Sequence, residues 1–477
     1  EISEPGDRAA FVSMLRTTLL AYPRTAIVVT SRDAGFRQVA AHLAPVCTQA
    51  TLSPFDADDI LRLTSLWHRE VVGDTERVRA DAEELARTIA ANDRIRRLAV
   101  NPLLLTTLLL VKRWVGSLPR RRAILYGKAV EVLLMTWNTE GHDPIPDDEA
   151  LPQLCYVAST MMLEALQKIS RPRLAALLQE ARSALPTELG YVGGTVDQFI
   201  RRVEERSSLL MMTGLDVEEG RLVEFFEFRH LTFQEYLTAQ AMTKGWHPGR
   251  QEGDTLVGVL EPHFEDERWR EVVPLAAVLG GKETEKLIRG LTAVGGREAT
   301  LLLAGCLADE AAARPETIQA AIRELVKHGS LVRRSSASLR GKYGEEFRAE
   351  AGRAFLSDGF DSADAGDALL AALRWQMPAL ESGEEPARSA ALLSEMLKKP
   401  DELSRCEGAM GIGFLNSGGT LEKRAPAVLE ALQPAGPFLV AMLEGSLPEA
   451  VAACFALQWL VGSRLWSPPG DSDLLGR

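Results

Sequence analysis

The stretch Phe226–Ala239, FEFRHLTFQEYLTA, carries two different hydrophobic periods. Apolar and polar residues alternate up to Phe228, as they do in a half-buried strand. From Thr232 onward the apolar residues follow a helical period, and Thr232 with Glu235 has the spacing of a capping box. His230 is therefore predicted to lie at a strand-to-helix junction, where a side chain and free backbone N–H groups can face one ligand.

The composition predicts a mainly α protein of two to four domains. The chain has 477 residues, is 46% hydrophobic and contains 6% aromatic residues, and its abundant Ala and Leu favour helices. The five cysteines form no CxxC pair, which argues against a disulfide framework or a zinc site and suits a cytoplasmic protein. They are Cys47, Cys155, Cys306, Cys406 and Cys454.

The charge of the chain is uneven. The formal net charge is −12, and residues 251–477 hold 34 acidic and 24 basic side chains. This acidic second half disfavours binding of nucleic acid by that half. The longest apolar run, Leu103–Val111, is too short to span a bilayer. The first residue is Glu1 rather than methionine, so we expect a fragment of a longer protein.

Three segments before residue 110 predict strands or helix starts. Thr25–Arg32 is an apolar, β-rich run that predicts a buried parallel strand, with Arg32 at its carboxyl end where it can reach a phosphate. Thr48–Leu52 predicts a second short strand, and Ser53 with Pro54 predicts the N-cap and first residue of the next helix. Pro102 after Asn101 predicts the start of a leucine-rich helix.

Later segments predict helices around one β-hairpin and then a long helical array. Leu209–Thr213 and Leu222–Phe228 form the expected hairpin, whose acidic turn suits DNA phosphates poorly. From about residue 268 short amphipathic helices follow one another, as in HEAT-like repeats or in an irregular helical domain. Gly411–Gly413 is interpreted as part of a loop, because as a phosphate cradle it lacks both a lysine and a preceding strand.

Four features in this order resemble a NACHT-type STAND ATPase, the family of animal NOD-like receptors and bacterial antiviral relatives. They are Thr30-Ser31-Arg32, the Leu52–Phe55 turn, Asn101-Pro102-Leu103 and Phe228–Ala239. The resemblance covers about residues 1–245. It implies the C-terminal part of an α/β nucleotide-binding domain at 1–53, a helical domain at 54–122 and a winged-helix domain at 123–245. A helical-repeat sensor domain would follow at 246–477.

The resemblance also implies roles for individual residues. In the family, the histidine matching His230 contacts the β-phosphate of ADP, and the arginine matching Arg32 lies near the γ-phosphate. The proline matching Pro102 packs against adenine, and Glu1 is similar to the end of the Walker B stretch, which makes it the catalytic candidate. The simpler alternatives are a hydrogen-bonded junction histidine, an exposed arginine at a strand end and an ordinary helix start.

The sequence contains no P-loop. No G-x-x-x-x-G-K-[ST] occurs, and the three Gly-Lys pairs are followed by Ala, Glu and Tyr. The chain alone should therefore be inactive as an ATPase, and ATP or ADP with Mg²⁺ would be bound by a parent protein that supplies the P-loop upstream. The sequence also has no G-x-S-x-G and no HExxH motif.

The implied function is a signalling switch that is closed with ADP and oligomeric with ATP. A protein trigger, for which phage is one source, would bind the C-terminal helices, and an N-terminal effector in the parent would respond. The high Ala, Arg and Gly content suggests a GC-rich bacterial genome and hence antiviral defence. One alternative is a STAND-type transcriptional regulator, disfavoured because the candidate recognition helix Thr232–Met242 lacks Lys and Arg. The other is a nucleotide-free scaffold.

Overall fold

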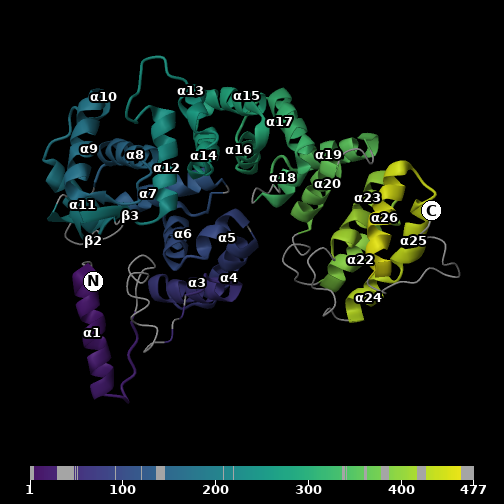
Figure 1. The fold of residues 1–477 in the computed structure, drawn as a ribbon, viewed down its shortest axis with the longest axis horizontal. Helices are drawn as coiled ribbons and strands as arrows, with labels where there is room; N and C mark the ends of the chain where they lie inside the picture. Colours follow the sequence, from purple (N-terminus) through teal and green to yellow (C-terminus); the bar gives the residue numbers. More distant parts are fainter. Residues whose placement is uncertain are drawn as a thin grey trace. The chain divides into compact units, whose positions relative to one another are not determined.

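The structure, a computed structural model, describes residues 5–29, 48, 50, 52–91, 93–119, 121–135, 145–207, 209–218, 220–335, 339, 341–358, 363–377, 386–415 and 426–462. The chain divides into two compact units, Glu1–Glu252 and Gly253–Arg477. Helices dominate both units (Figure 1), which confirms the mainly α fold predicted from composition.

The first unit combines helices with the three strands that the described residues contain. The elements are α1 (Pro5–Ala21), α3 (Ala57–Val71), α4 (Glu76–Ala91), α5 (Asp93–Ala99), α6 (Pro102–Val115), α7 (Arg122–Met135), α8 (Asp147–Leu163), β1 (Ile169–Ser170), α9 (Arg171–Ala184), α10 (Pro186–Leu189), α11 (Val196–Arg206), β2 (Leu210–Glu218), β3 (Arg221–Phe228) and α12 (Leu231–Lys244).

The three strands form one antiparallel sheet in the order β1-β3-β2. The predicted hairpin is confirmed as β2 and β3, with Leu210 opposite Phe228 and Glu218 opposite Arg221. The side chains of Phe226 and Phe228 are buried, as the alternating pattern of β3 requires. The chain leaves the sheet at the end of β3 and enters α12 after two intervening residues, Arg229 and His230.

Helix α12 is fixed in the core of this unit by its contact with α8. Phe233, Tyr236 and Leu237 are buried on α12, and the side chain of Gln234 donates a hydrogen bond of 3.2 Å to the carbonyl of Leu166. A helix that is buried along so much of its length is stabilised mainly by packing. The junction between β3 and α12 is therefore held at both of its ends.

The strand predicted over Thr25–Arg32 is wrong for residues 25–29. These residues form no strand, and the side chain of Val28 is 90% exposed. A parallel strand needs neighbouring strands to bond its backbone, and the described residues provide none beside this segment. Residues 30–32 lie outside the described part of the chain, as does Glu1. The predicted strand over Thr48–Leu52 is likewise not formed at the described positions 48, 50 and 52, and Leu52 is 96% exposed.

The second unit is helical throughout its described residues. The predicted succession of short helices from about residue 268 is confirmed. The elements are α13 (Leu256–Leu260), η1 (Glu261–His263), η2 (Glu267–Trp269), α14 (Val272–Leu279), η3 (Gly281–Glu283), α15 (Thr284–Val294), α16 (Gly296–Ala308), α17 (Pro315–Lys327), α18 (Gly329–Arg334), α19 (Gly344–Asp358), α20 (Ala363–Gln376), α22 (Pro386–Met396), α23 (Glu402–Phe414), α24 (Pro426–Leu432), α25 (Ala435–Met442) and α26 (Leu447–Gly462).

The interpretation of Gly411–Gly413 as a loop is wrong, because these residues lie inside helix α23. Glycine disfavours a helix interior by about 1 kcal/mol relative to alanine. Here the missing side chain lets neighbouring helices approach closely. A Cβ atom on Gly411 would lie 2.5 Å from a methyl group of Leu393, and one on Gly413 would overlap the ring of Phe455.

Candidate functional site

His230 lies at the junction of β3 and α12, as the sequence predicts. It is the N-cap of α12, with extended backbone angles of φ −146° and ψ 140°. Its Nδ1 accepts a hydrogen bond of 3.2 Å from the backbone N–H of Thr232 and lies 3.0 Å from the Thr232 hydroxyl. The expected Thr232–Glu235 capping box does not form, because the helix begins at Leu231 and His230 takes the capping position itself.

The protonation of His230 follows from its surroundings. The side chain is half-buried, and burial lowers the pKa of its imidazole below the ordinary value of 6.5. The ring is then neutral at pH 7, and a neutral ring that accepts at Nδ1 carries its proton on Nε2. Within the described part of the chain no hydrogen bond engages Nε2, so this atom can donate to a ligand.

Arg229, the residue before His230, was not singled out from the sequence. Its backbone N–H donates a 2.9 Å hydrogen bond to the carbonyl of Leu209, which continues the sheet by one residue. Its side chain is half-buried, and burial alone lowers the pKa of the guanidinium. None of the described carboxylates contributes to that shift or forms an ion pair with this arginine. A half-buried cation without a carboxylate partner favours an anionic ligand.

Pro102 is the first residue of α6, as predicted, and its side chain is exposed. Asn101 caps this helix, and its side-chain oxygen accepts hydrogen bonds of 2.9 Å and 3.3 Å from the backbone N–H groups of Leu103 and Leu104. The Leu52–Phe55 turn lies beside it, because the N–H of Phe55 donates to the carbonyl of Val100 at 2.9 Å. Two of the predicted motifs are therefore neighbours.

The helix that follows the Leu52–Phe55 turn begins later than predicted. Its N-cap is Asp56 rather than Ser53, and Asp56 forms a capping box with Asp59. The carboxylate of Asp56 accepts from the N–H of Asp59 at 2.9 Å, and the carboxylate of Asp59 accepts in return at 3.3 Å. Aspartate is as good an N-cap as serine, so the sequence offered two equivalent starting points.

Helix α7 connects the surroundings of Pro102 and His230. Helix α6 packs on α7, and α7 packs on α12. Tyr126 of α7 meets Tyr236 of α12 edge to face, with ring centroids 6.2 Å apart. Pro102 and His230 thus belong to elements that share one neighbour, whereas the candidate residues Glu1 and Arg32 lie outside the described part of the chain.

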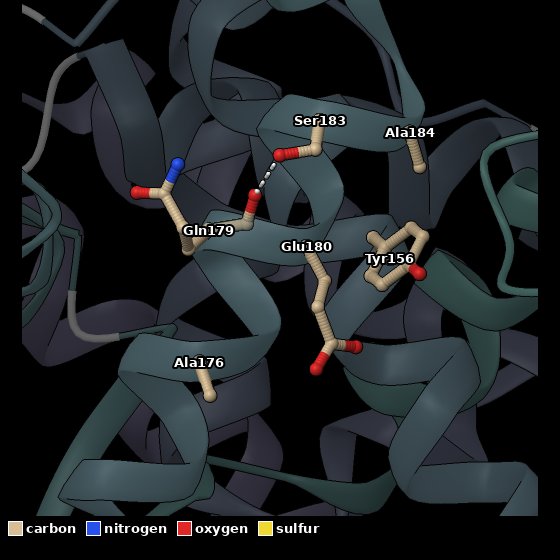
Figure 2. A pocket seen from close by; sticks show the side chains of 6 residues that line it. All are labelled: Tyr156, Ala176, Gln179, Glu180, Ser183 and Ala184. Atoms are coloured by element: carbon tan, nitrogen blue, oxygen red, sulfur yellow. Dashed lines mark hydrogen bonds between the residues drawn. The ribbon is translucent and has the colours of Figure 1, made fainter.

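A shallow pocket lies between α8 and α9 (Figure 2), and it includes none of the predicted site residues. Tyr156 of α8 faces Glu180 of α9, and the hydroxyl of Ser183 donates a 3.0 Å hydrogen bond to the carbonyl of Gln179. Burial, followed by the charge of Glu180, raises the pKa of Tyr156. The one charged lining residue is acidic, so this pocket does not suit a phosphate. It is lined by Tyr156, Ala176, Gln179, Glu180, Ser183 and Ala184.

Helix α11 is a second helix to compare with the expected recognition helix Thr232–Met242. In a helix-turn-helix module the second helix enters DNA, and in the winged-helix domain expected at 123–245 that position would fall on α11, which precedes the hairpin. Helix α11 does contain arginines, but Arg202 pairs with Glu149 at 3.1 Å. The helix has three basic and three acidic residues, so its net charge is zero, and a helix without net positive charge attracts DNA phosphates poorly. They are Arg201, Arg202 and Arg206 against Asp197, Glu204 and Glu205.

Asp147, the first residue of α8, supplies a testable prediction. One of its carboxylate oxygens is buried without a hydrogen-bond partner, and its pKa is raised by burial and then by the charges of Glu131 and Asp148. A raised folded-state pKa means that the ionised group destabilises the fold above that pKa and that stability returns as the pH falls through it. Asp147→Asn should therefore raise the melting temperature at pH 7.

The matched measurement is thermal unfolding of the wild type and of Asp147→Asn at pH 7 and near pH 4. The difference between the two proteins should shrink at the lower pH, where Asp147 gains its proton in the folded state. Asp58→Asn is the control, because Asp58 is an exposed acidic residue in the first turn of another helix, α3. A melting temperature of Asp147→Asn equal to or below that of the wild type at pH 7 contradicts the prediction.

The described residues hold neither a metal-binding cluster nor a helix that could span a membrane. Among the described residues no group of three or more His, Cys, Asp and Glu side chains is arranged to hold a metal ion. None of the described helices combines the length and the apolar character that crossing a membrane requires. No protein-family model matches the chain, and no curated protein matches it.

Proposed function

We propose that this chain is the regulatory part of a nucleotide-gated STAND signalling switch, in which His230 contacts the phosphates of ADP in the closed state. The observation that carries the proposal is the junction of β3 and α12, where the neutral His230 offers Nε2–H and the preceding Arg229 is half-buried and forms no ion pair with any carboxylate of the described residues. A hydrogen-bond donor and a half-buried positive charge each suit a phosphate group.

The fold around His230 supports the winged-helix assignment. From α8 the order is helix, strand, three helices (α9, the four-residue α10 and α11), strand and strand. Apart from the short α10, this order and the sheet order β1-β3-β2 are like those of a winged helix. In the proposed switch this module closes over the nucleotide instead of binding DNA. Pro102 would pack against the adenine from the exposed start of α6, and Arg32 would act near the γ-phosphate.

The residues present fit a diphosphate better than they fit Mg²⁺. His230 and Arg229 supply a donor and a positive charge, whereas the described residues hold no carboxylate cluster for a divalent ion. In our proposal the longer parent protein provides the P-loop and the magnesium ligands, with Glu1 as a candidate. Bound ATP would then supply the energy difference between the two states, and an N-terminal effector would be clustered by oligomerisation.

The proposal is tested by identifying the nucleotide that copurifies with the full-length protein. The protein is purified without added nucleotide and denatured, and the released small molecules are separated by ion-exchange chromatography. Close to one ADP per chain supports the proposal. A folded monomer that releases no nucleotide would favour the scaffold alternative, in which the C-terminal helices bind a partner and the junction histidine is only a helix cap.

Arg229→Gln should reduce the copurified ADP several-fold without unfolding the protein. The charge-assisted hydrogen bonds of an arginine to phosphate contribute about 1.5–3 kcal/mol, and glutamine keeps most of the side-chain volume. The control is Arg201→Gln, which removes an exposed arginine of α11. Nucleotide content is compared at equal protein concentration and salt. Equal losses in both variants would point to a general charge effect rather than to a contact at Arg229.

A further inference from the structure

The carboxylate of Glu407 is completely buried in the second unit, and one arginine binds both of its oxygens. Nε of Arg348 donates to Oε1 at 2.7 Å, and Nη2 donates to Oε2 at 2.7 Å. Glu407 has 0% exposed side chain, whereas Arg348 keeps 26%. The pair joins α19 to α23 across 59 residues of sequence.

The pair lies where two groups of helices meet within this unit. Phe355 of α19 and Leu369 of α20 belong to the same apolar cluster as Leu393 of α22 and Met410 of α23. On its other side α23 is bound to α26 by Arg405, whose Nε lies 2.5 Å from a carboxylate oxygen of Glu449. Helix α23 is therefore held by ion pairs to a helix before it and to a helix after it.

The physical chemistry of such a pair favours a role in alignment. Removing two charges from water costs about as much as their attraction returns, so a buried pair adds little net stability relative to apolar side chains of equal size. Removing one partner is different, because the remaining charge stays buried and unpaired. Leaving Glu407 unpaired therefore costs more than leaving Arg348 unpaired, because the side chain of Arg348 already reaches solvent.

We propose that the Arg348–Glu407 pair is a latch that holds helices α22–α26 against α19 and α20, and that these helices separate as a body when it is broken. Opening lets the carboxylate of Glu407 reach water. It also uncovers apolar side chains of the shared cluster, including Leu369 and Leu393. The inference concerns the second unit alone and does not depend on the proposed nucleotide site.

The test is hydrogen exchange followed by mass spectrometry on the full chain. In Arg348→Met, which strands the Glu407 charge, peptides from α19, α20 and α23 should exchange roughly ten- to a hundred-fold faster than in the wild type. Peptides from α14–α17 should keep their wild-type rates. Glu407→Gln should give a smaller rise in the same peptides, and binding of a hydrophobic dye should increase in parallel.

Two further variants complete the experiment. Arg353→Met is the matched control on α19, because Arg353 is 73% exposed and pairs with Glu350 one turn away; it should leave all rates unchanged. The double variant Arg348→Met with Glu407→Leu leaves no buried charge and should exchange more slowly than Arg348→Met alone. Arg348→Lys keeps the positive charge but loses the planar guanidinium that binds both carboxylate oxygens. It should therefore accelerate exchange in the same peptides less than Arg348→Met does. It replaces Arg348→Met in the test if that variant does not fold.

Two outcomes would overturn the latch. A rise of equal size in α14–α17 would show that the unit opens as one cooperative body. Exchange in the double variant as fast as in Arg348→Met alone would show that the stranded charge of Glu407 does not cause the opening. Selective acceleration in α19, α20 and α23, relieved in the double variant, supports it.

Discussion

Replacing His230 with alanine should raise the fraction of full-length protein that oligomerises without a trigger by about ten-fold or more. In the proposed closed state, Nε2–H of His230 donates to a charged phosphate, and such hydrogen bonds contribute about 1.5–3 kcal/mol. A ligand contact made in only one of two states shifts the equilibrium between them by its full free energy. Each 1.4 kcal/mol lost is about a ten-fold change. Mass photometry of the untriggered protein measures the oligomer directly.

The control separates the ligand contact from the helix cap. His230 also caps α12 through Nδ1, so alanine should in addition lower the stability of the first unit by about 1 kcal/mol. Asparagine is among the best N-cap residues and should restore the cap while it still lacks the reach of Nε2. We therefore expect His230→Asn to unfold like the wild type and to oligomerise like His230→Ala. An asparagine variant that behaves as wild type in both measurements would reduce His230 to a cap.

The sequence predicted the surroundings of His230 well because two local signals meet there. The alternation up to Phe228 and the helical period after Thr232 are properties of neighbouring residues, and each requires one face to be buried. The structure buries Phe226 and Phe228 on the sheet and Phe233 and Leu237 on the helix. Local periodicity therefore predicted the position of the junction correctly. The N-cap was predicted at Thr232 but is His230, so the helix begins earlier than predicted.

Features that depend on distant contacts could not be predicted in the same way. Among the described residues no carboxylate pairs with Arg229, which is a property of the folded surroundings that no neighbouring residue in the sequence signals. Similarly, the apolar run Thr25–Val29 has the composition of a central strand, yet a strand also needs partners beside it. In the sequence, Gly411 and Gly413 are typical of a loop. In the structure they lie in a helix, because Leu393 and Phe455 pack against them and leave no room for a larger side chain.

Gly329→Ala should destabilise the second unit by about 3 kcal/mol, at the upper end of the usual cost of overpacking. Gly329 begins α18 and lies directly on α20. A Cβ atom there would overlap the carbonyl oxygen of Asp364 and lie 2.6 Å from the backbone nitrogen of Ala368. Because these are backbone atoms, no rotamer change relieves the clash. The helices must separate, and the 2.8 Å hydrogen bond from the N–H of Ser330 to Asp364 would be strained.

Gly366→Ala on α20 is the matched control, with the opposite expected sign. Its Cβ would meet Met410 at 3.5 Å and Phe355 at 3.8 Å, which are ordinary contacts. Alanine is the better helix former by about 1 kcal/mol, so this variant should be slightly more stable than the wild type. Urea denaturation of both variants, followed by tryptophan fluorescence, measures the difference. Of the two glycines, Gly329 faces backbone atoms and Gly366 faces side chains. If the two alanine variants have the same effect on stability, Gly329 is not required for the close approach of α18 to α20.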